Sequence, residues 1–390
     1  MRYKALKPNS RVAIAGGGLL GRLLAWQLLE HGHQVSVYEA GSLVESPSAA
    51  KTAAGMISPI SEAIDTELLM YDLGMVALQQ WPKWLQQLLQ AMPDQPVYYS
   101  HQGSVIVAHQ RDQSLLHQYR QDIQRQLLEC AQGHWLDGTT IAEMEPDLEA
   151  YFRQGLYFPD EAHIDNRHLL QVLLTRIQQL GGECIEHTPV DTDVFTIRER
   201  LSYTDQHFDS VIDCRGVGAK PQWRNIRGVR GEILRVKTDE VMLRRPVRLL
   251  HPRYQLYIVP KPNSEFVIGA TQIESEDCSP MSVQSALELN SALYAINSAF
   301  AEARILEMDV NLRPALNHNR PNIQCQPGLL RINGLYRHGY LVAPVVVQHT
   351  LALLLDSITL KHDFSEILFD GGESGQLIEE TQSAYAIDER

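Results

Sequence analysis

Residues 11–39 constrain the fold of this chain more than any other stretch of it. Residues 12–15 form a short apolar run, which predicts a buried parallel strand. Residues 19–29 carry apolar side chains at helical spacing, and residues 35–38 form a second apolar run that predicts another strand. A strand, a helix and a strand in this order predict a Rossmann-like α/β fold.

A glycine pattern, G-x-G-x-x-G, joins the first strand to the helix. Gly16 permits the tight turn, Gly18 lets a pyrophosphate approach the backbone, and Gly21 lets the helix pack closely on the strand. The N-terminus of the helix supplies unpaired N–H groups and the positive end of a dipole. Glu39 ends the second strand, where a carboxylate accepts hydrogen bonds from an adenosine ribose. The unit predicts a dinucleotide site, and the motif alone leaves NAD and FAD open.

Length and charge narrow the class of protein. The chain has 390 residues, enough for two domains, and a formal net charge of −13. This charge argues against nucleic acid or an anionic membrane as the main partner. Five cysteines without a C-x-x-C pair indicate reduced thiols, and the N-terminus has no apolar signal core. We therefore expect a cytoplasmic protein. We also expect no transmembrane segment, because the longest apolar stretch, residues 340–355, is too short and too interrupted for a membrane-spanning helix.

Elements of the nucleotide-binding kind recur near residues 165–218 and near the end of the chain, with antiparallel-looking strands between them. This order predicts two interwoven domains rather than two consecutive ones. The predicted segments are 1–60, 160–227 and 317–375 for the nucleotide-binding domain, 61–159 and 228–316 for an antiparallel-sheet (α+β) substrate domain, and 376–390 for a C-terminal tail.

Three local patterns make definite predictions. Residues 66–92 predict a helical stretch with a kink or a break at Pro82. Residues 307–312 predict a strand that ends at Arg313-Pro314, and the last long helix is expected over residues 341–358.

The sequence has no motif for a metal or for a nucleophile. It contains no H-E-x-x-H, no cysteine and histidine spacing for a metal, no G-x-S-x-G and no Walker-type loop. We therefore expect no metal, and we expect the chemistry to come mostly from the bound dinucleotide.

Several later segments carry a resemblance to a known family. They are residues 53–56, 187–190, 229–232, 257–260, 267–271, 312–314 and 337–344. In their order and spacing, together with the glycine pattern, the chain resembles the glycine oxidases of the D-amino acid oxidase superfamily, including those of thiamine biosynthesis. The resemblance implies FAD as the cofactor of the nucleotide-binding domain. Related sarcosine oxidases hold FAD through a cysteine shortly after the Arg-Pro pair, whereas Cys325 comes several residues too late, so we expect non-covalent FAD.

The resemblance also implies the substrate site. Arg313 matches the arginine that pairs with the substrate carboxylate, a role that suits the planar guanidinium group. Tyr257 matches the tyrosine whose hydroxyl joins this clamp, and Arg337 matches a second arginine near the flavin. These three residues are the predicted catalytic set.

The resemblance further implies the cofactor contacts. Gly55 and Met56 match the loop over the isoalloxazine, and Val190 matches a residue whose backbone meets the adenine. Residues 338–341 match a helix start beside the flavin, where the positive dipole end stabilises negative charge on the ring. The full expected set is Gly16, Gly18, Leu20, Gly21, Glu39, Ala40, Ala53, Ala54, Gly55, Met56, Val190, Gly216, His338, Gly339, Tyr340 and Leu341.

Three positions depart from the pattern of the family. His338 stands where asparagine is common, Asn311 replaces a glycine, and Gln272 occupies a position that is typically methionine. These differences leave the substrate side chain open and do not bear on the flavin.

The predicted reaction is oxidative deamination of glycine or another small amine-bearing carboxylate by hydride transfer to the flavin. With O2 as the acceptor it gives H2O2, an oxo acid and ammonia. The alternatives are a D-amino acid dehydrogenase with a quinone acceptor, a flavin-binding maturation or partner protein without turnover, and a nicotinamide dehydrogenase. The electron acceptor, a role in thiamine synthesis and a homo-oligomeric state stay open.

Overall fold

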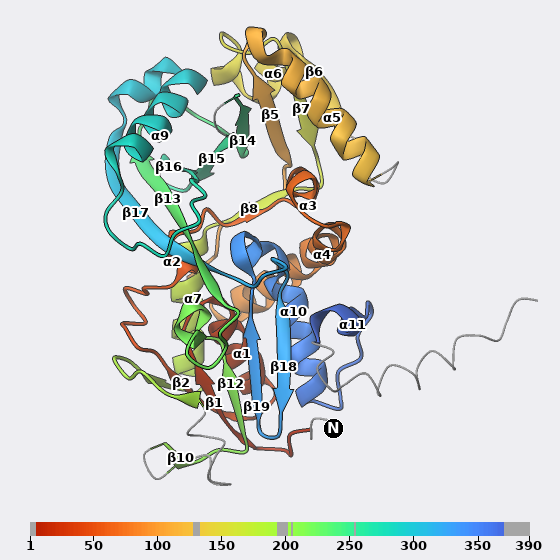
Figure 1. The fold of residues 1–390 in the computed structure, drawn as a ribbon, viewed down its shortest axis with the longest axis vertical. Coiled ribbons are helices and arrows are strands. Elements are labelled where there is room, and N and C mark those ends of the chain that lie inside the picture. The colour runs from red at the N-terminus through yellow and green to blue at the C-terminus, as the bar shows by residue number, and fades with distance from the viewer. Residues whose placement is uncertain (1–4, 128–132, 193–201, 204–205, 253–254, 370–390) are drawn as a thin grey trace, which may run out of the picture.

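Two large β-sheets organise the chain, one in the lower and one in the upper part of the molecule as drawn in Figure 1. The computed structural model describes residues 5–127, 133–192, 202–203, 206–252 and 255–369. Cys130 and the predicted tail at 376–390 lie outside the described residues. The four described cysteines are free.

The first sheet has six strands in the order β18-β19-β12-β1-β2-β9. All neighbouring strands pair in parallel except β18, which runs antiparallel to β19. Its strands are β1 (Arg11–Ala15), β2 (Gln34–Tyr38), β9 (Glu183–Ile185), β12 (Ser210–Asp213), β18 (Asn322–Gln326) and β19 (Leu329–Asn333). The mainly parallel pairing of these strands confirms the predicted Rossmann-like part of the fold. The strands come from the start, the middle and the end of the chain.

The second sheet has eight strands in the order β17-β13-β16-β15-β14-β5-β7-β6. Every pair in it is antiparallel except β14 with β5. Its strands are β5 (Ser104–Ala108), β6 (His134–Asp137), β7 (Gln154–Phe158), β13 (Arg227–Lys237), β14 (Val247–Leu250), β15 (Gln255–Lys261), β16 (Glu265–Gly269) and β17 (Arg304–Ala315). The predicted mixture of a parallel and an antiparallel sheet is thus present, whereas the exact domain boundaries stay a prediction.

Shorter strands and the helices connect the two sheets. The small sheets contain β3 (Met56–Ile57), β4 (Tyr99–Ser100) and β8 (Ala162–Ile164), and β10 (Ser202–Tyr203) with β11 (Gln206–His207). The α-helices are α1 (Leu19–Glu30), α2 (Ala49–Thr52), α3 (Pro59–Glu62), α4 (Leu68–Ala91), α5 (Gln113–Leu127), α6 (Gly138–Met144), α7 (Asn166–Gln179), α9 (Val283–Ile296), α10 (Gly339–Leu354) and α11 (Ser365–Leu368). The 3-10 helices are η1 (Ala63–Asp65), η2 (Gln110–Asp112), η3 (Pro146–Leu148), η4 (Gly216–Ala219), η5 (Ser298–Glu302) and η6 (Tyr336–His338).

Three local predictions need correction. Of the kink or break expected at Pro82, the break is wrong: helix α4 runs through Pro82, and the packing of its buried face on α10 offsets the missing hydrogen bond. Strand β17 begins at Arg304 and continues through Pro314, because an edge strand tolerates a proline whose N–H group the sheet does not need. Helix α10 begins two residues earlier than predicted, at Gly339, and ends at Leu354.

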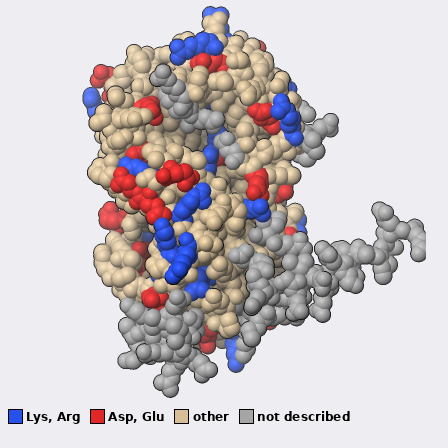
Figure 2. All heavy atoms as spheres, viewed as in Figure 1, with Lys and Arg blue, Asp and Glu red and all other residues tan. Residues whose placement is uncertain are grey.

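Charged side chains of both signs share the surface. On the face drawn in Figure 2, the described acidic and basic side chains lie next to one another, and neither sign forms a continuous surface. Among the described residues, no helix is both long and apolar enough to cross a membrane.

Trp81 joins α4 to α10 and generates a stability prediction. It is 0% exposed, and its indole N–H donates to the carbonyl of Tyr340 over 2.8 Å. We expect Trp81→Ala to lower the free energy of unfolding by about 3–5 kcal/mol, since it leaves a cavity and an unpaired carbonyl. Leu89→Ala, at a position 44% exposed on the same helix, is the control and should change it by less than about 0.5 kcal/mol. Urea unfolding followed by circular dichroism measures both, and equal losses would contradict this packing account.

Candidate active site

A cavity of about 1540 Å³ receives residues from both large sheets. Gly16 and Glu39 line it from the parallel sheet, and Tyr257 and Arg313 line it from β15 and β17. The volume exceeds the roughly 300–1,000 Å³ of an ordinary small-molecule site and suits a dinucleotide with a substrate beside it.

The glycine turn has the shape that a bound pyrophosphate requires. Gly16 has a φ of +100°, and a Cβ there would lie 2.6 Å from the carbonyl oxygen of Cys214. A Cβ on Gly21 would overlap the carbonyl oxygen of Gly16, so this glycine permits the close packing of α1. Gly18 lines the cavity, and a Cβ there would meet no protein atom closer than 3.5 Å, at Ser48. Its missing side chain therefore leaves room for a ligand, which fits a dinucleotide cofactor.

Glu39 is held at the edge of the cavity by backbone groups. Its two carboxylate oxygens accept hydrogen bonds from the N–H groups of Gly17, at 2.7 Å, and Gly41, at 3.0 Å. Each oxygen has a second lone pair, so the carboxylate keeps acceptor capacity for ribose hydroxyls. Arg22, which sequence reasoning missed, is 1% exposed and donates to the carbonyl of Gly17 over 2.6 Å. The glycine turn is thus fixed from both sides.

A buried lysine, Lys261, contacts residues 53–56, which include the loop expected over the isoalloxazine. Lys261 Nζ donates to the carbonyl of Ala54 over 2.7 Å and to that of Ile164 over 2.6 Å. Burial lowers the pKa of Lys261 to about 7. Because these carbonyls satisfy a buried ammonium, Lys261 ties β15 of the antiparallel sheet to the cavity wall. Sequence reasoning missed this residue.

Arg313 presents a positive charge to the cavity. Its guanidinium donates to the carbonyl oxygens of Arg230, at 3.2 Å, and Thr271, at 3.1 Å. Among the residues that the structure describes, Arg313 has no ion-pair partner. A Cβ on Gly231 would overlap the guanidinium, so the glycine of the 229–232 motif makes room for it. Burial raises the pKa of Tyr257, and the charge of Arg313 opposes that rise, so the phenol beside it stays neutral.

Arg337 differs from Arg313 because it has a carboxylate partner. Glu62 Oε2 pairs with Arg337 over 2.6 Å, and Glu62 Oε1 pairs with the buried Arg248 over 2.5 Å. Burial alone would raise the pKa of Glu62, but Arg337, Arg248 and His338 lower it to about 2. Gln272, one of the departures from the family pattern, accepts a hydrogen bond from Arg337 over 3.3 Å. Glu62 and Arg248 were missed because no local sequence pattern marks them.

His338 and the start of α10 also face the cavity. The imidazole is 3% exposed and lies 3.8 Å from Glu62, and burial lowers its pKa to about 4. It is therefore neutral at neutral pH. The first residues of α10, Gly339 to Leu341, line the cavity, so the positive end of a 16-residue helix points into the site.

The structure brings the predicted site residues together. All three of the predicted catalytic set line the cavity, and so does every predicted cofactor residue except Gly21, which lies in the packing of α1 on β1. Their individual roles stay predictions. Fold and cavity together define the class of dinucleotide-binding α/β proteins in which a second sheet lines the same cavity as the glycine turn.

Comparisons with known proteins agree with this class. The family profile described as "FAD dependent oxidoreductase" matches residues 11–353. The putative thiamine biosynthesis oxidoreductase ThiO of Rhizobium etli is 36% identical over 345 residues, 88% of this chain and 96% of that protein. The glycine oxidase of Bacillus subtilis is 24% identical over 371 residues, 91% of this chain and 95% of that protein. Among solved structures, glycine oxidase from Geobacillus kaustophilus superimposes with a TM-score of 0.76 at 22% identity, covering 92% of this chain and 98% of that chain.

The chain belongs to the family of FAD-dependent oxidoreductases. The predicted enzyme class, the FAD cofactor and the resemblance to glycine oxidases are therefore confirmed. Membership of this family argues against two of the alternatives, the nicotinamide dehydrogenase and the flavin-binding partner without turnover.

The two arginines give a matched pair of variants. We expect Arg313→Ala to lower kcat/KM for a small amino acid about a hundredfold, roughly 3 kcal/mol, because the substrate carboxylate loses its charged partner. Arg313→Lys should recover part of this loss, since an ammonium lacks the planar fork. Arg337→Ala should cost less than about tenfold, because Glu62 already pairs with Arg337.

Flavin reduction rates measured against substrate concentration test this order, with the flavin spectrum as a control for folding. An amine without a carboxylate should be nearly indifferent to Arg313→Ala. A larger loss in Arg337→Ala than in Arg313→Ala would show that the carboxylate is held by Arg337.

Proposed function

We propose that this enzyme oxidises glycine, or another small amine that carries one carboxylate, to the imine, which hydrolyses to an oxo acid and ammonia. The observation that carries the proposal is the guanidinium of Arg313, which donates to two backbone carbonyls and has no carboxylate partner among the described residues. Tyr257 lies beside it, in the cavity that the glycine turn also lines. The flavin, when bound, accepts the hydride that leaves the substrate Cα. Dioxygen is the proposed final acceptor, with H2O2 as its product.

The residues around Arg313 orient the substrate rather than move protons. Glu62 has a pKa of about 2 and is paired with two arginines, and His338 has a pKa of about 4. Burial raises the pKa of Tyr257 above its ordinary value. None of these three groups is poised to act as a base at neutral pH, and no protein base is needed if the amine binds deprotonated. Arg313 and Tyr257 then contribute to the rate by positioning.

Arg313 also favours a small monocarboxylate. Arg337 and Arg248, two other cations of this cavity, already pair with Glu62. A substrate with one carboxylate can pair with the Arg313 guanidinium without breaking the ion pairs of Glu62, whereas a second carboxylate would have to compete with Glu62. The names of the relatives, a thiamine biosynthesis oxidoreductase and a glycine oxidase, support a small amino acid and a role in thiamine synthesis. A cytoplasmic location and a homo-oligomeric state remain predictions.

Two measurements on the purified protein test the proposal. Acid precipitation should release yellow FAD into the supernatant, since Cys325 lies outside the cavity lining and the cofactor is expected to be non-covalent. Under anaerobic conditions, glycine, sarcosine and D-alanine should bleach the flavin, and L-amino acids should not. Bleaching only by L-amino acids would sink the proposed substrate class.

The reoxidation step separates the two remaining electron acceptors. After bleaching by glycine, admission of air should restore the oxidised spectrum within seconds and produce H2O2. If air acts slowly and a soluble quinone restores the spectrum at once, the enzyme is a D-amino acid dehydrogenase instead.

A further inference from the structure

Residues 47–52 form one wall of the cavity, and the segment is too short to hold its own position. Helix α2 within it spans four residues and has no side-chain cap, and helices of this length are not stable alone. Four of its residues besides Thr52 line the cavity, and Ser48 lies opposite Gly18 of the glycine turn. The place of this wall therefore depends on contacts that other elements make with it.

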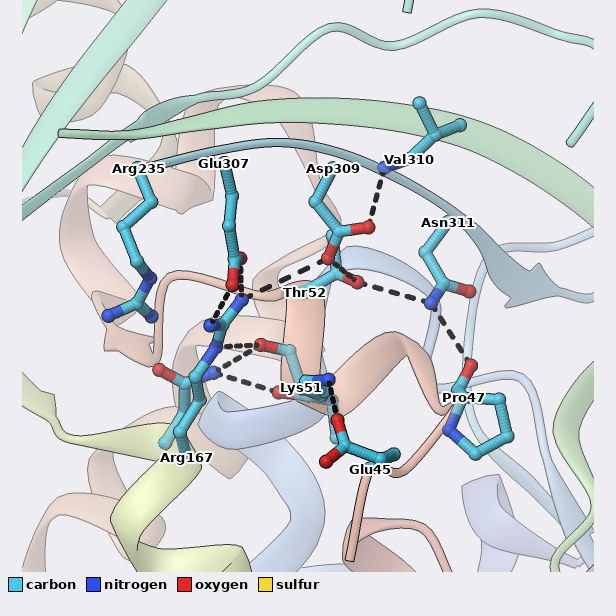
Figure 3. Close-up of polar contacts among 12 residues, drawn as sticks. Glu45, Pro47, Lys51, Thr52, Arg167, Arg235, Glu307, Asp309, Val310 and Asn311 are labelled. Carbon is cyan, nitrogen blue, oxygen red and sulfur yellow. Dashed lines mark hydrogen bonds and ion pairs between the residues drawn. The ribbon is translucent and has the colours of Figure 1, made fainter. Parts of the chain in front are cut away.

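The contacts come from one face of β17, as Figure 3 shows. Thr52 is 6% exposed, and its hydroxyl donates to Asp309 Oδ2 over 2.7 Å. The side-chain amide of Asn311 donates to the Thr52 hydroxyl and to the carbonyl of Pro47, both over 3.1 Å. Asp309 and Asn311 are two residues apart on the strand, so their side chains share a face. The Thr52 hydroxyl is thus both donor and acceptor at the centre of the cluster.

Helix α7 adds a second layer of contacts to the same segment. The guanidinium of Arg167 donates to the carbonyl of Lys51 over 3.3 Å and to both carboxylate oxygens of Glu307, over 2.9 and 2.5 Å. Asn166 donates to the carbonyls of Ala50, at 2.9 Å, and Lys51, at 3.0 Å. The ion pair between Arg167 and Glu307 is partly exposed and is therefore weak by itself. Its planar, two-bond geometry nevertheless orients Arg167 toward the segment.

We propose that Thr52, Asp309 and Asn311 form a latch that holds residues 47–52 closed along the flavin site and slows the release of FAD. They are positioning residues, because they act on the cofactor through the wall that they hold. The proposal rests on the FAD cofactor of the family and not on the identity of the substrate.

The role proposed for Asn311 in the latch differs from the role that its sequence position indicated. Its departure from the family's glycine was expected to bear on the substrate side chain, but its amide is directed at Pro47 and Thr52. Arg313 lies two residues further along the same strand and faces the cavity. One strand therefore sets both the wall beside the cofactor and the arginine that meets the substrate.

Thr52→Val tests the latch, since it removes the central hydroxyl and keeps the shape of the side chain. The expected result is release of FAD about tenfold faster than from the wild type, which corresponds to two ordinary hydrogen bonds. FAD-loaded protein is diluted, and the FAD that passes an ultrafiltration membrane is measured over time. Thr52→Ser keeps the hydroxyl and should release FAD within about twofold of the wild-type rate.

Lys51→Ala is the matched control within the same segment. The Lys51 side chain pairs with the exposed Glu45, over 3.5 Å, and makes no hydrogen bond to Thr52, Asp309 or Asn311 in the described part of the chain, whereas its backbone carbonyl makes the contacts described above. This variant should release FAD at the wild-type rate. Wild-type release from Thr52→Val, or equally fast release from Thr52→Val and Thr52→Ser, would overturn the latch.

Asn311→Ala decides the matter if Thr52→Val does not fold. It removes the two donated hydrogen bonds at a half-buried position and should also release FAD several-fold faster. Unchanged FAD release together with a raised KM for glycine would show that Asn311 acts on the substrate and would overturn the proposal.

Discussion

The site depends on one unbalanced charge, the guanidinium of Arg313. A partly buried cation is stabilised by hydrogen-bond or ion-pair partners. Arg313 donates to two backbone carbonyls and contacts no carboxylate among the described residues. The surroundings keep it in this state. Gly231 leaves the space that the guanidinium fills, and Thr271, whose carbonyl Arg313 contacts, is itself held by a hydrogen bond to Glu232 over 3.0 Å. This arrangement is the basis of the proposal that Arg313 pairs with a small carboxylate.

Glu62 separates the roles of the two arginines. Its pKa is lowered to about 2, so the carboxylate stays ionised at neutral pH and keeps Arg337 and Arg248 paired. The stability that follows from this lowered pKa is present above the ordinary carboxyl pKa of about 4.3 and is lost as the pH falls toward 2. The ion pairs therefore hold throughout the neutral range, and the proposed binding of a substrate carboxylate to Arg313 does not require them to break.

Local patterns predicted the parts of the fold that local physics determines. The strand, glycine turn and helix at residues 11–30 follow from side-chain spacing and from the backbone freedom of Gly16, and the structure has them where they were expected. The full length of β17 did not follow, because an edge strand is half-exposed and its apolar pattern is weak. Arg313 and Tyr257 were named only through resemblance, since an arginine before a proline carries no local signal.

Long-range contacts account for what the sequence could not show. Glu62 and Arg248 are 186 residues apart, and Thr52 and Asp309 are 257 residues apart. No periodicity or spacing connects such pairs, and each becomes visible only when the two sheets close on the cavity. The same holds for Lys261, whose ammonium is satisfied by carbonyls from two other segments.

The central claim is the proposal that Arg313, and not Arg337, is the cation that pairs with the substrate carboxylate. The most direct measurement is a crystal structure of the FAD-loaded protein with a small carboxylate such as glycolate bound. We predict both carboxylate oxygens within about 3 Å of the Arg313 guanidinium, with the Arg337–Glu62 pair unbroken. A carboxylate bound to Arg337, with Glu62 displaced from it, would contradict the account.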